Sequence, residues 1–132
     1  MSDWRPTFEA LVASRMRTPF RWGVHDCCMW AADAVLALSG IDPAADLRGA
    51  YCDEAGARRL LESLGGLEAV GARGGQPQSP LLSIAGDVGI VTDGERHMLG
   101  VCAGHVWLVA ARRGLAVLPL NAVSASWRVA RA

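Results

Sequence analysis

The spacing of apolar residues changes after Pro80, and this change constrains the fold more than any other feature of the sequence. Before it, apolar residues recur at helical spacing and predict helices over Pro6–Met16, Cys27–Leu38 and Glu54–Leu64. After it, short apolar segments are separated by turn residues and predict five strands: Asp87–Val91, Met98–Cys102, His105–Ala110, Leu115–Leu120 and Ser126–Val129. Helices followed by a run of antiparallel strands indicate an α+β fold.

The length of the chain, 132 residues, gives room for one domain, and we expect a single domain over residues 1–132. We predict that the nearly all-apolar helix Cys27–Leu38 is the central, buried helix and that it packs on the C-terminal antiparallel sheet. The segment Gly71–Pro80 is rich in glycine and proline, so we expect an irregular loop there.

Charge and hydropathy exclude several classes of protein. The 13 basic residues, all of them arginine, balance 13 acidic residues, whereas a nucleic-acid-binding protein normally carries a basic excess. A hydrophobic content of 52% argues against disorder. We expect no membrane insertion, because no apolar run approaches the ~20 residues that a membrane span needs. The polar start Met1–Pro6 predicts no signal peptide and synthesis in the cytoplasm.

The four cysteines are expected to be reduced thiols, because no secretory signal is predicted. A zinc or iron–sulfur site made of Cys27 or Cys28 with Cys52 and Cys102 is an alternative, but no Cys-x-x-Cys pair supports it. We therefore expect no metal and no cofactor.

Cys27 is the first residue of the predicted central helix, directly after Asp26 in the N-cap position. The free N–H groups and the positive end of the helix dipole stabilise a thiolate at such a position, which is how catalytic cysteines are activated. The alternative is that Cys27 is a small buried apolar residue at a helix start.

The segment around Cys27 resembles the aromatic-Gly-x-x-Asp-Cys segment of NlpC-type, papain-like cysteine peptidases. This segment is Phe20–Asp33, and Ala85-Gly86-Asp87-Val88 and Met98–Gly104 are similar to two strands of the same family. The resemblance implies an NlpC/papain-like fold and a nucleophilic role for Cys27.

A still closer resemblance, over about residues 18 to 129, is to a phage branch of this superfamily encoded among tail genes. The further segments that carry it are Arg48-Gly49-Ala50-Tyr51, Gly56-Ala57, Gly65-Gly66 and Trp127-Arg128-Val129. This resemblance implies a place in the virion tail, with tail-tip or baseplate proteins as partners and peptidoglycan as the substrate.

The sequence indicates the general base less clearly than the nucleophile. Aligning the strand Leu99–Cys102 on that of the peptidases places Met98, and not a histidine, at the position of the base. His97 is one residue away and is our first choice, while His105 and His25 remain alternatives. The third, orienting residue should fall near Ala110, which cannot form a side-chain hydrogen bond.

Three other residues are candidates for substrate binding or for stabilising an oxyanion. Trp22 could line a cleft, Tyr51 could donate a hydrogen bond to an oxyanion, and Asp26 is either the N-cap or a carboxylate of the site.

Two functions follow from the sequence and its resemblance. One is cleavage of a peptidoglycan stem peptide as the tail crosses the cell wall, and the other is an inactive structural or assembly role in the tail tip.

Overall fold

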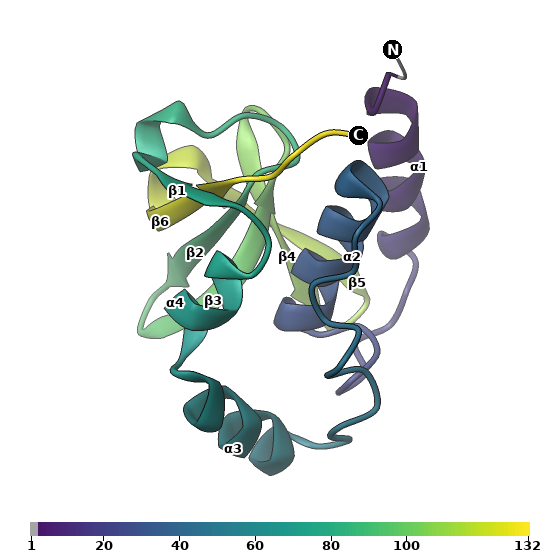
Figure 1. Cartoon of the computed structure of the whole chain (residues 1–132), viewed down its shortest axis with the longest axis vertical. Helices are drawn as coiled ribbons and strands as arrows, with labels where there is room; N and C mark the ends of the chain where they lie inside the picture. Colours follow the sequence, from purple (N-terminus) through teal and green to yellow (C-terminus); the bar gives the residue numbers. More distant parts are fainter. Residues whose placement is uncertain (1–2) are drawn as a thin grey trace.

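The computed structural model describes residues 3–132 and has the expected α+β architecture, with N-terminal helices packed on a C-terminal antiparallel sheet (Figure 1). The sheet has six strands in the order β1-β6-β2-β3-β4-β5. The helices are α1 Arg5–Arg15, α2 Cys27–Ser39, α3 Glu54–Leu64 and α4 Leu67–Ala72. The strands are β1 Gln76–Gln78, β2 Val88–Asp93, β3 Arg96–Cys102, β4 Val106–Ala111, β5 Gly114–Pro119 and β6 Val123–Arg128.

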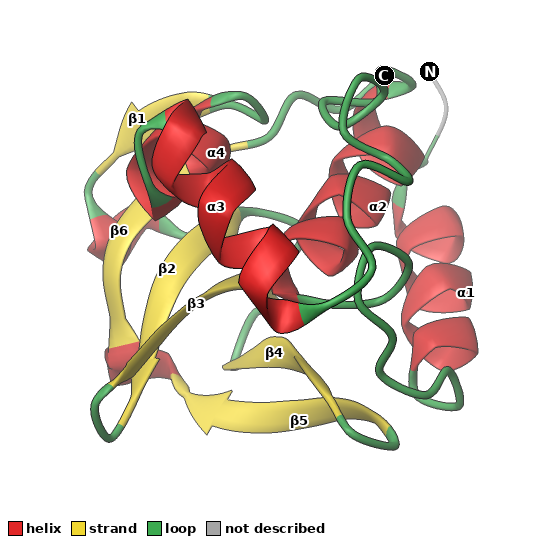
Figure 2. Cartoon of the chain, turned by 90° about the horizontal axis from the view of Figure 1, so that it is seen from below, coloured by secondary structure: helices red, strands yellow, loops and turns green. Residues whose placement is uncertain are grey.

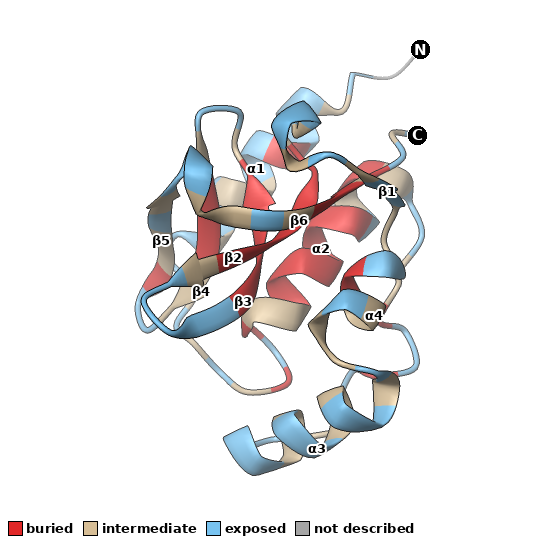
Figure 3. Ribbon diagram, turned by 90° about the vertical axis from the view of Figure 1, so that its left-hand side faces the viewer, coloured by how far each residue is buried: buried red, intermediate tan, exposed pale blue. Residues whose placement is uncertain are grey.

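Helix α2 is the central helix, and its caps are those that the sequence predicts. The Asp26 carboxylate accepts a hydrogen bond of 2.9 Å from the backbone N–H of Met29. Gly40 ends the helix in the left-handed conformation, with φ of 79°. Between these caps most side chains are buried (Figure 3), as the apolar composition of the segment requires.

The two faces of strand β3 pack against different parts of the core. Leu99 and Val101 lie in the cluster that contains Trp30 of α2. Met98 and Cys102 belong to a second cluster with Val91, Trp107 and Val109. Because side chains alternate along a strand, odd-numbered residues of β3 face α2 and even-numbered residues face away from it.

Helix α3 lies at the end of the molecule, and none of its residues is fully buried (Figures 1 and 3). Its bounds are those predicted from the sequence. The inward face is half-buried and consists of Ala57, Leu60, Leu61 and Leu64. This amphipathic helix therefore turns its apolar face inward, but that face is only partly buried.

The expectation of an irregular loop over Gly71–Pro80 is wrong. Residues 67–72 form α4, and Gln76–Gln78 form β1, which pairs with Ser126–Arg128 of β6. Gly71 is buried, and a Cβ atom on it would lie 2.5 Å from the Trp127 ring. Glycine here permits close packing of α4 on β6, a long-range contact that local composition does not indicate.

Two segments of the resemblance, Gly86-Asp87-Val88 and Trp127-Arg128-Val129, form one structural unit. Asp87 is fully buried. Its carboxylate accepts hydrogen bonds from Arg128 Nε at 2.8 Å, Arg131 Nη1 at 2.9 Å and the Val129 N–H at 3.1 Å. Asp87 thus attaches the C-terminal segment to the start of β2.

Among the described residues, no helix has the length and apolar character needed to cross a membrane.

Candidate functional site

Cys27, the first residue of α2, lies against Leu99 of strand β3, which pairs with β4. The pairing of these strands covers Val101–Leu108 and Cys102–Trp107. The carbonyl of Leu108, a residue of this pairing, also accepts a hydrogen bond of 2.9 Å from the indole N–H of Trp30 in α2. The half-buried Cys27 packs against both hydrophobic clusters of the core. Cys27 therefore lies at the contact between α2 and the sheet.

The surroundings of Cys27 favour its thiolate form. Its Sγ lies 3.9 Å from the Sγ of Cys28. Hydrogen bonding from the Cys28 thiol lowers the pKa of Cys27, with further N–H donors at Leu99 and Cys28, although burial acts in the opposite direction. The same thiol–thiol contact, together with burial, raises the pKa of Cys28. Of the two adjacent thiols, Cys27 is therefore the one whose pKa is lowered.

A cavity of about 280 Å³ opens beside Cys27. One wall is the start of α2, another is the beginning of β3, and the third is the apolar face of α3. Figure 2 shows α3 running across this end of the molecule. Trp22 also lines the cavity, and its ring meets the Phe20 ring edge-on at a centroid distance of 4.8 Å. The predicted placement of Trp22 in a cleft beside Cys27 agrees with the structure.

His97, on β3, lines the same cavity as Cys27. It is an odd-numbered residue of β3 and shares the face of Leu99 and Val101, which is the face toward α2. The one-residue offset therefore does not remove His97 from the cavity, which Met98 also lines, although the His97 side chain is exposed. Its Nδ1 atom lies 3.1 Å from Oγ1 of Thr92 on β2.

The other two histidines lie elsewhere. His25 is buried, its Nε2 is 2.9 Å from the Gly114 carbonyl oxygen, and its ring packs edge-on against Trp30. His105 is exposed in the turn between β3 and β4, at the opposite end of β3 from His97. Neither lines the cavity beside Cys27, whereas His97 does.

Asp26 and Tyr51 hold the start of α2 in place. Oδ2 of Asp26 accepts hydrogen bonds from the Gly23 N–H at 2.8 Å and from the Tyr51 hydroxyl at 2.5 Å. Burial, followed by the contact with the Asp26 carboxylate, raises the pKa of Tyr51. Asp26 is thus the N-cap, and the Tyr51 hydroxyl, proposed from the sequence as an oxyanion donor, donates to Asp26 in this structure.

Gly23 completes this support. Its φ is +80°, and a Cβ atom on it would lie 2.3 Å from the Tyr51 carbonyl oxygen. Only glycine allows this approach without displacing the backbone. Two separate segments of the resemblance, one containing Gly23 and Asp26 and the other containing Tyr51, therefore meet at the helix start that carries Cys27.

Sequence reasoning missed Thr92. Ala110 of β4, the position expected for an orienting residue, does line the cavity, but its side chain offers no hydrogen bond. The partner of His97 comes from the strand on the other side of β3. A two-residue turn at Gly94-Glu95 pairs Thr92 directly with His97.

The cysteines do not converge on one site. Cys52 is exposed, and Cys102 is buried on the face of β3 that points away from α2. Within residues 3–132, no group of three His, Cys, Asp or Glu side chains is placed to hold a metal ion.

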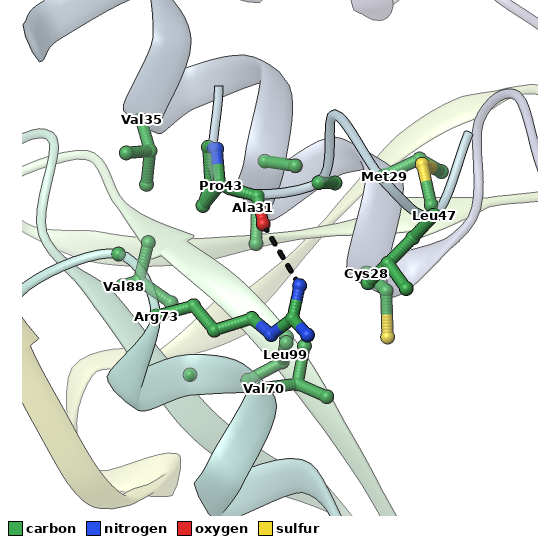
Figure 4. A pocket seen from close by; sticks show the side chains of 14 residues that line it. Cys28, Met29, Ala31, Val35, Pro43, Leu47, Val70, Arg73, Val88 and Leu99 are labelled. Carbon is green, nitrogen blue, oxygen red and sulfur yellow. Dashed lines mark hydrogen bonds between the residues drawn. The ribbon is translucent and has the colours of Figure 1, made fainter. Parts of the chain in front are cut away.

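A second cavity, beside Cys28, measures about 30 Å³, about the volume of one water molecule. Arg73 lines it and donates a hydrogen bond of 3.2 Å to the Pro43 carbonyl (Figure 4).

Comparison with known proteins gives one clear relationship. No curated protein and no solved structure matches this chain. A family model described as "Domain of unknown function (DUF6950)" matches residues 1–129, nearly the whole sequence. The chain therefore belongs to the DUF6950 family.

Proposed function

We propose that this protein is a phage tail-tip component with an NlpC-type, papain-like fold that cleaves amide bonds in peptidoglycan stem peptides. The observation that carries the proposal is that Cys27, at the start of a buried helix, and the exposed His97 line the same cavity. A thiol at a helix start and a histidine on the adjacent sheet are the two groups that such an enzyme needs.

The reaction follows from these two groups. His97 takes the thiol proton as the Cys27 sulfur attacks the amide carbonyl carbon, and a C–S bond forms. Backbone N–H groups at the start of α2 stabilise the oxyanion of the tetrahedral intermediate. The C–N bond then breaks, His97 gives the proton to the leaving amine, and a thioester remains. Water, deprotonated by His97, hydrolyses the thioester to a carboxylate and restores the thiol.

A second candidate is an inactive structural or assembly role in the tail tip with the same fold. It is favoured by Ala110, which gives His97 no hydrogen bond from β4. It is also favoured by the hydrogen-bond partners, because the Cys27 thiol contacts Cys28 and the His97 ring contacts Thr92. Docking into an assembly accords with the neutral net charge, since a wall hydrolase acting alone gains from basic charge near an anionic polymer.

The two candidates are separated by incubating the protein with purified peptidoglycan and measuring newly formed amino and carboxyl groups. We expect equal numbers of each, because hydrolysis of one amide bond releases one amine and one carboxylate. Absence of both at every pH at which the protein is folded contradicts the enzymatic proposal. Co-purification with tail-tip proteins in that case supports the structural role.

Alkylation of the thiols tests the activation of Cys27 without any substrate. We expect iodoacetamide to modify Cys27 at a lower pH than Cys28 and Cys102, because the pKa of Cys27 is lowered and those of the other two are raised. The modified residues are identified by fragmentation mass spectrometry, which distinguishes modification of Cys27 from that of the adjacent Cys28.

In Cys28→Ala the alkylation profile of Cys27 should move to higher pH, because the largest cause of its lowered pKa is removed. A Cys27 profile centred near pH 8.5, like that of a free thiol, contradicts the prediction.

A further inference from the structure

We propose that Thr92 is the positioning residue of His97 and takes the place that Ala110 leaves without a hydrogen bond. The inference rests on the proposed function, because it assigns a role to the contact between Thr92 Oγ1 and His97 Nδ1, which measures 3.1 Å.

The geometry of the hairpin fixes this contact. Thr92 and His97 are direct partners in the antiparallel pairing of β2 with β3, only one residue pair away from the turn. Directly opposed residues project from the same face of the sheet, with Cβ atoms about 4.5–5.5 Å apart. The β2–β3 pairing continues without interruption from Val88–Val101 to Asp93–Arg96, so the register of the pair is held along the whole length of the hairpin.

The chemistry of the contact suits a base that acts through Nε2. The nitrogen that is hydrogen-bonded to a partner decides which ring nitrogen remains available. When His97 has taken the thiol proton, both of its nitrogens carry hydrogen, so Oγ1 of Thr92 can only accept from Nδ1–H. A hydroxyl that accepts in the same way from the neutral ring keeps the proton on Nδ1 and leaves Nε2 free to receive the Cys27 proton.

Ala110 explains why the partner must come from β2. Ala110 lines the cavity from β4, on the other side of β3, and its methyl group cannot accept a hydrogen bond. Thr92 is half-buried and shares a sheet face with His97, whereas Asp93 projects from the other face, and the Thr92–His97 contact is open to solvent. The threonine carries no charge, so it orients the ring without the electrostatic stabilisation that a carboxylate would give to the imidazolium.

The contact is tested by the ¹⁵N chemical shifts of the His97 ring in the full chain, assigned by the loss of its signals in His97→Gln. We expect the wild-type protein above the pH of ring protonation to hold the proton on Nδ1. Thr92→Val, which keeps the shape but removes the hydroxyl, should shift the ring toward the Nε2–H form, and Thr92→Ser should restore it. Thr7→Val, an exposed substitution on α1, is the control and should change nothing.

Turnover adds a second measurement. Thr92→Val is expected to lower kcat by about 10- to 100-fold with KM nearly unchanged, less than the ~10²–10⁴-fold that loss of the general base itself would cost. A wild-type ring that carries its proton on Nε2, or a Thr92→Val ring with the wild-type shifts, overturns the inference. A wild-type protein without any turnover instead contradicts the proposed function, and the chemical shifts still decide whether Thr92 orients the ring.

Discussion

Replacing Asp87 with alanine is expected to lower the free energy of unfolding by about 3–5 kcal/mol, the usual effect of breaking a buried ion pair on one side. The Asp87 carboxylate is completely buried and accepts five hydrogen bonds. The donors are Gln78 Nε2, the Ile84 N–H, Arg128 Nε, the Val129 N–H and Arg131 Nη1. Without it, the largely buried Arg131 guanidinium loses its anion, and two backbone N–H groups lose their acceptor.

The measurement is urea denaturation followed by tryptophan fluorescence, to which Trp127, next to Arg128, contributes. Asp93→Ala is a matched control, because Asp93 is the exposed last residue of the same strand and its loss should cost less than about 0.5 kcal/mol. A loss below about 1 kcal/mol in Asp87→Ala would show that the C-terminal segment does not depend on this carboxylate.

The same carboxylate predicts how stability depends on pH. Burial by itself would raise the pKa of Asp87, but hydrogen bonds from the Ile84 N–H, Gln78, Arg131 and the Val129 N–H outweigh it and lower the pKa. A folded-state pKa below the unfolded value of about 3.9 gives stability that is complete above pH 3.9 and is lost as the pH falls through the folded value. The wild-type protein should therefore lose stability more steeply below about pH 4 than Asp87→Ala does.

The parts of the fold that the sequence predicts well are those fixed by local chemistry. Asp26 and Gly40 mark the two ends of α2, because a short acceptor side chain satisfies a free N–H group and glycine adopts a positive φ without strain. Helix α3 has the predicted bounds for the same reason: Asp53 accepts from the Gly56 N–H, and Gly65 has a φ of 102°. Each cap lies within a few residues of the turn that it stabilises.

The parts that the sequence does not predict depend on contacts between distant segments. Gln76–Gln78 has the composition of a loop and becomes a strand only because β6, about 50 residues further along the chain, offers a free edge. Glycine is a residue type that weakens helices, yet Gly71 lies in α4. The Trp127 ring packs directly on it and leaves no room for a side chain. Neither partner can be recognised from the local spacing of apolar residues.

The candidate site is divided in the same way. The helix start together with the resemblance makes Cys27 a candidate nucleophile, and its position at a strand end makes His97 the first candidate for the base. The role of the Tyr51 hydroxyl requires knowledge of a contact with Asp26 across 25 positions of the chain. Oxyanion stabilisation and support of a helix start both use a hydroxyl donor, so the residue type by itself does not distinguish them.

Cys27→Ala is expected to reduce turnover of peptidoglycan stem peptides by about 10³-fold or more, because removal of a nucleophile eliminates the covalent pathway. The replacement removes one sulfur atom from a half-buried position and leaves the Asp26 cap intact, so the protein should remain folded. Thermal unfolding followed by circular dichroism checks this point. A folded Cys27→Ala protein with the wild-type rate would exclude Cys27 as the nucleophile.

Cys28→Ala is the matched control, because it deletes the same atom one residue further along the same helix. It should retain turnover, since Cys27 and His97 still line the cavity. Its rate–pH profile should nevertheless move to higher pH, because the Cys28 thiol is the largest cause of the lowered pKa of Cys27. Loss of turnover in Cys27→Ala, together with a shifted but active profile in Cys28→Ala, requires one nucleophilic and one supporting thiol. Equal loss in both variants would contradict that division, because it would mean that both sulfur atoms take part in the reaction.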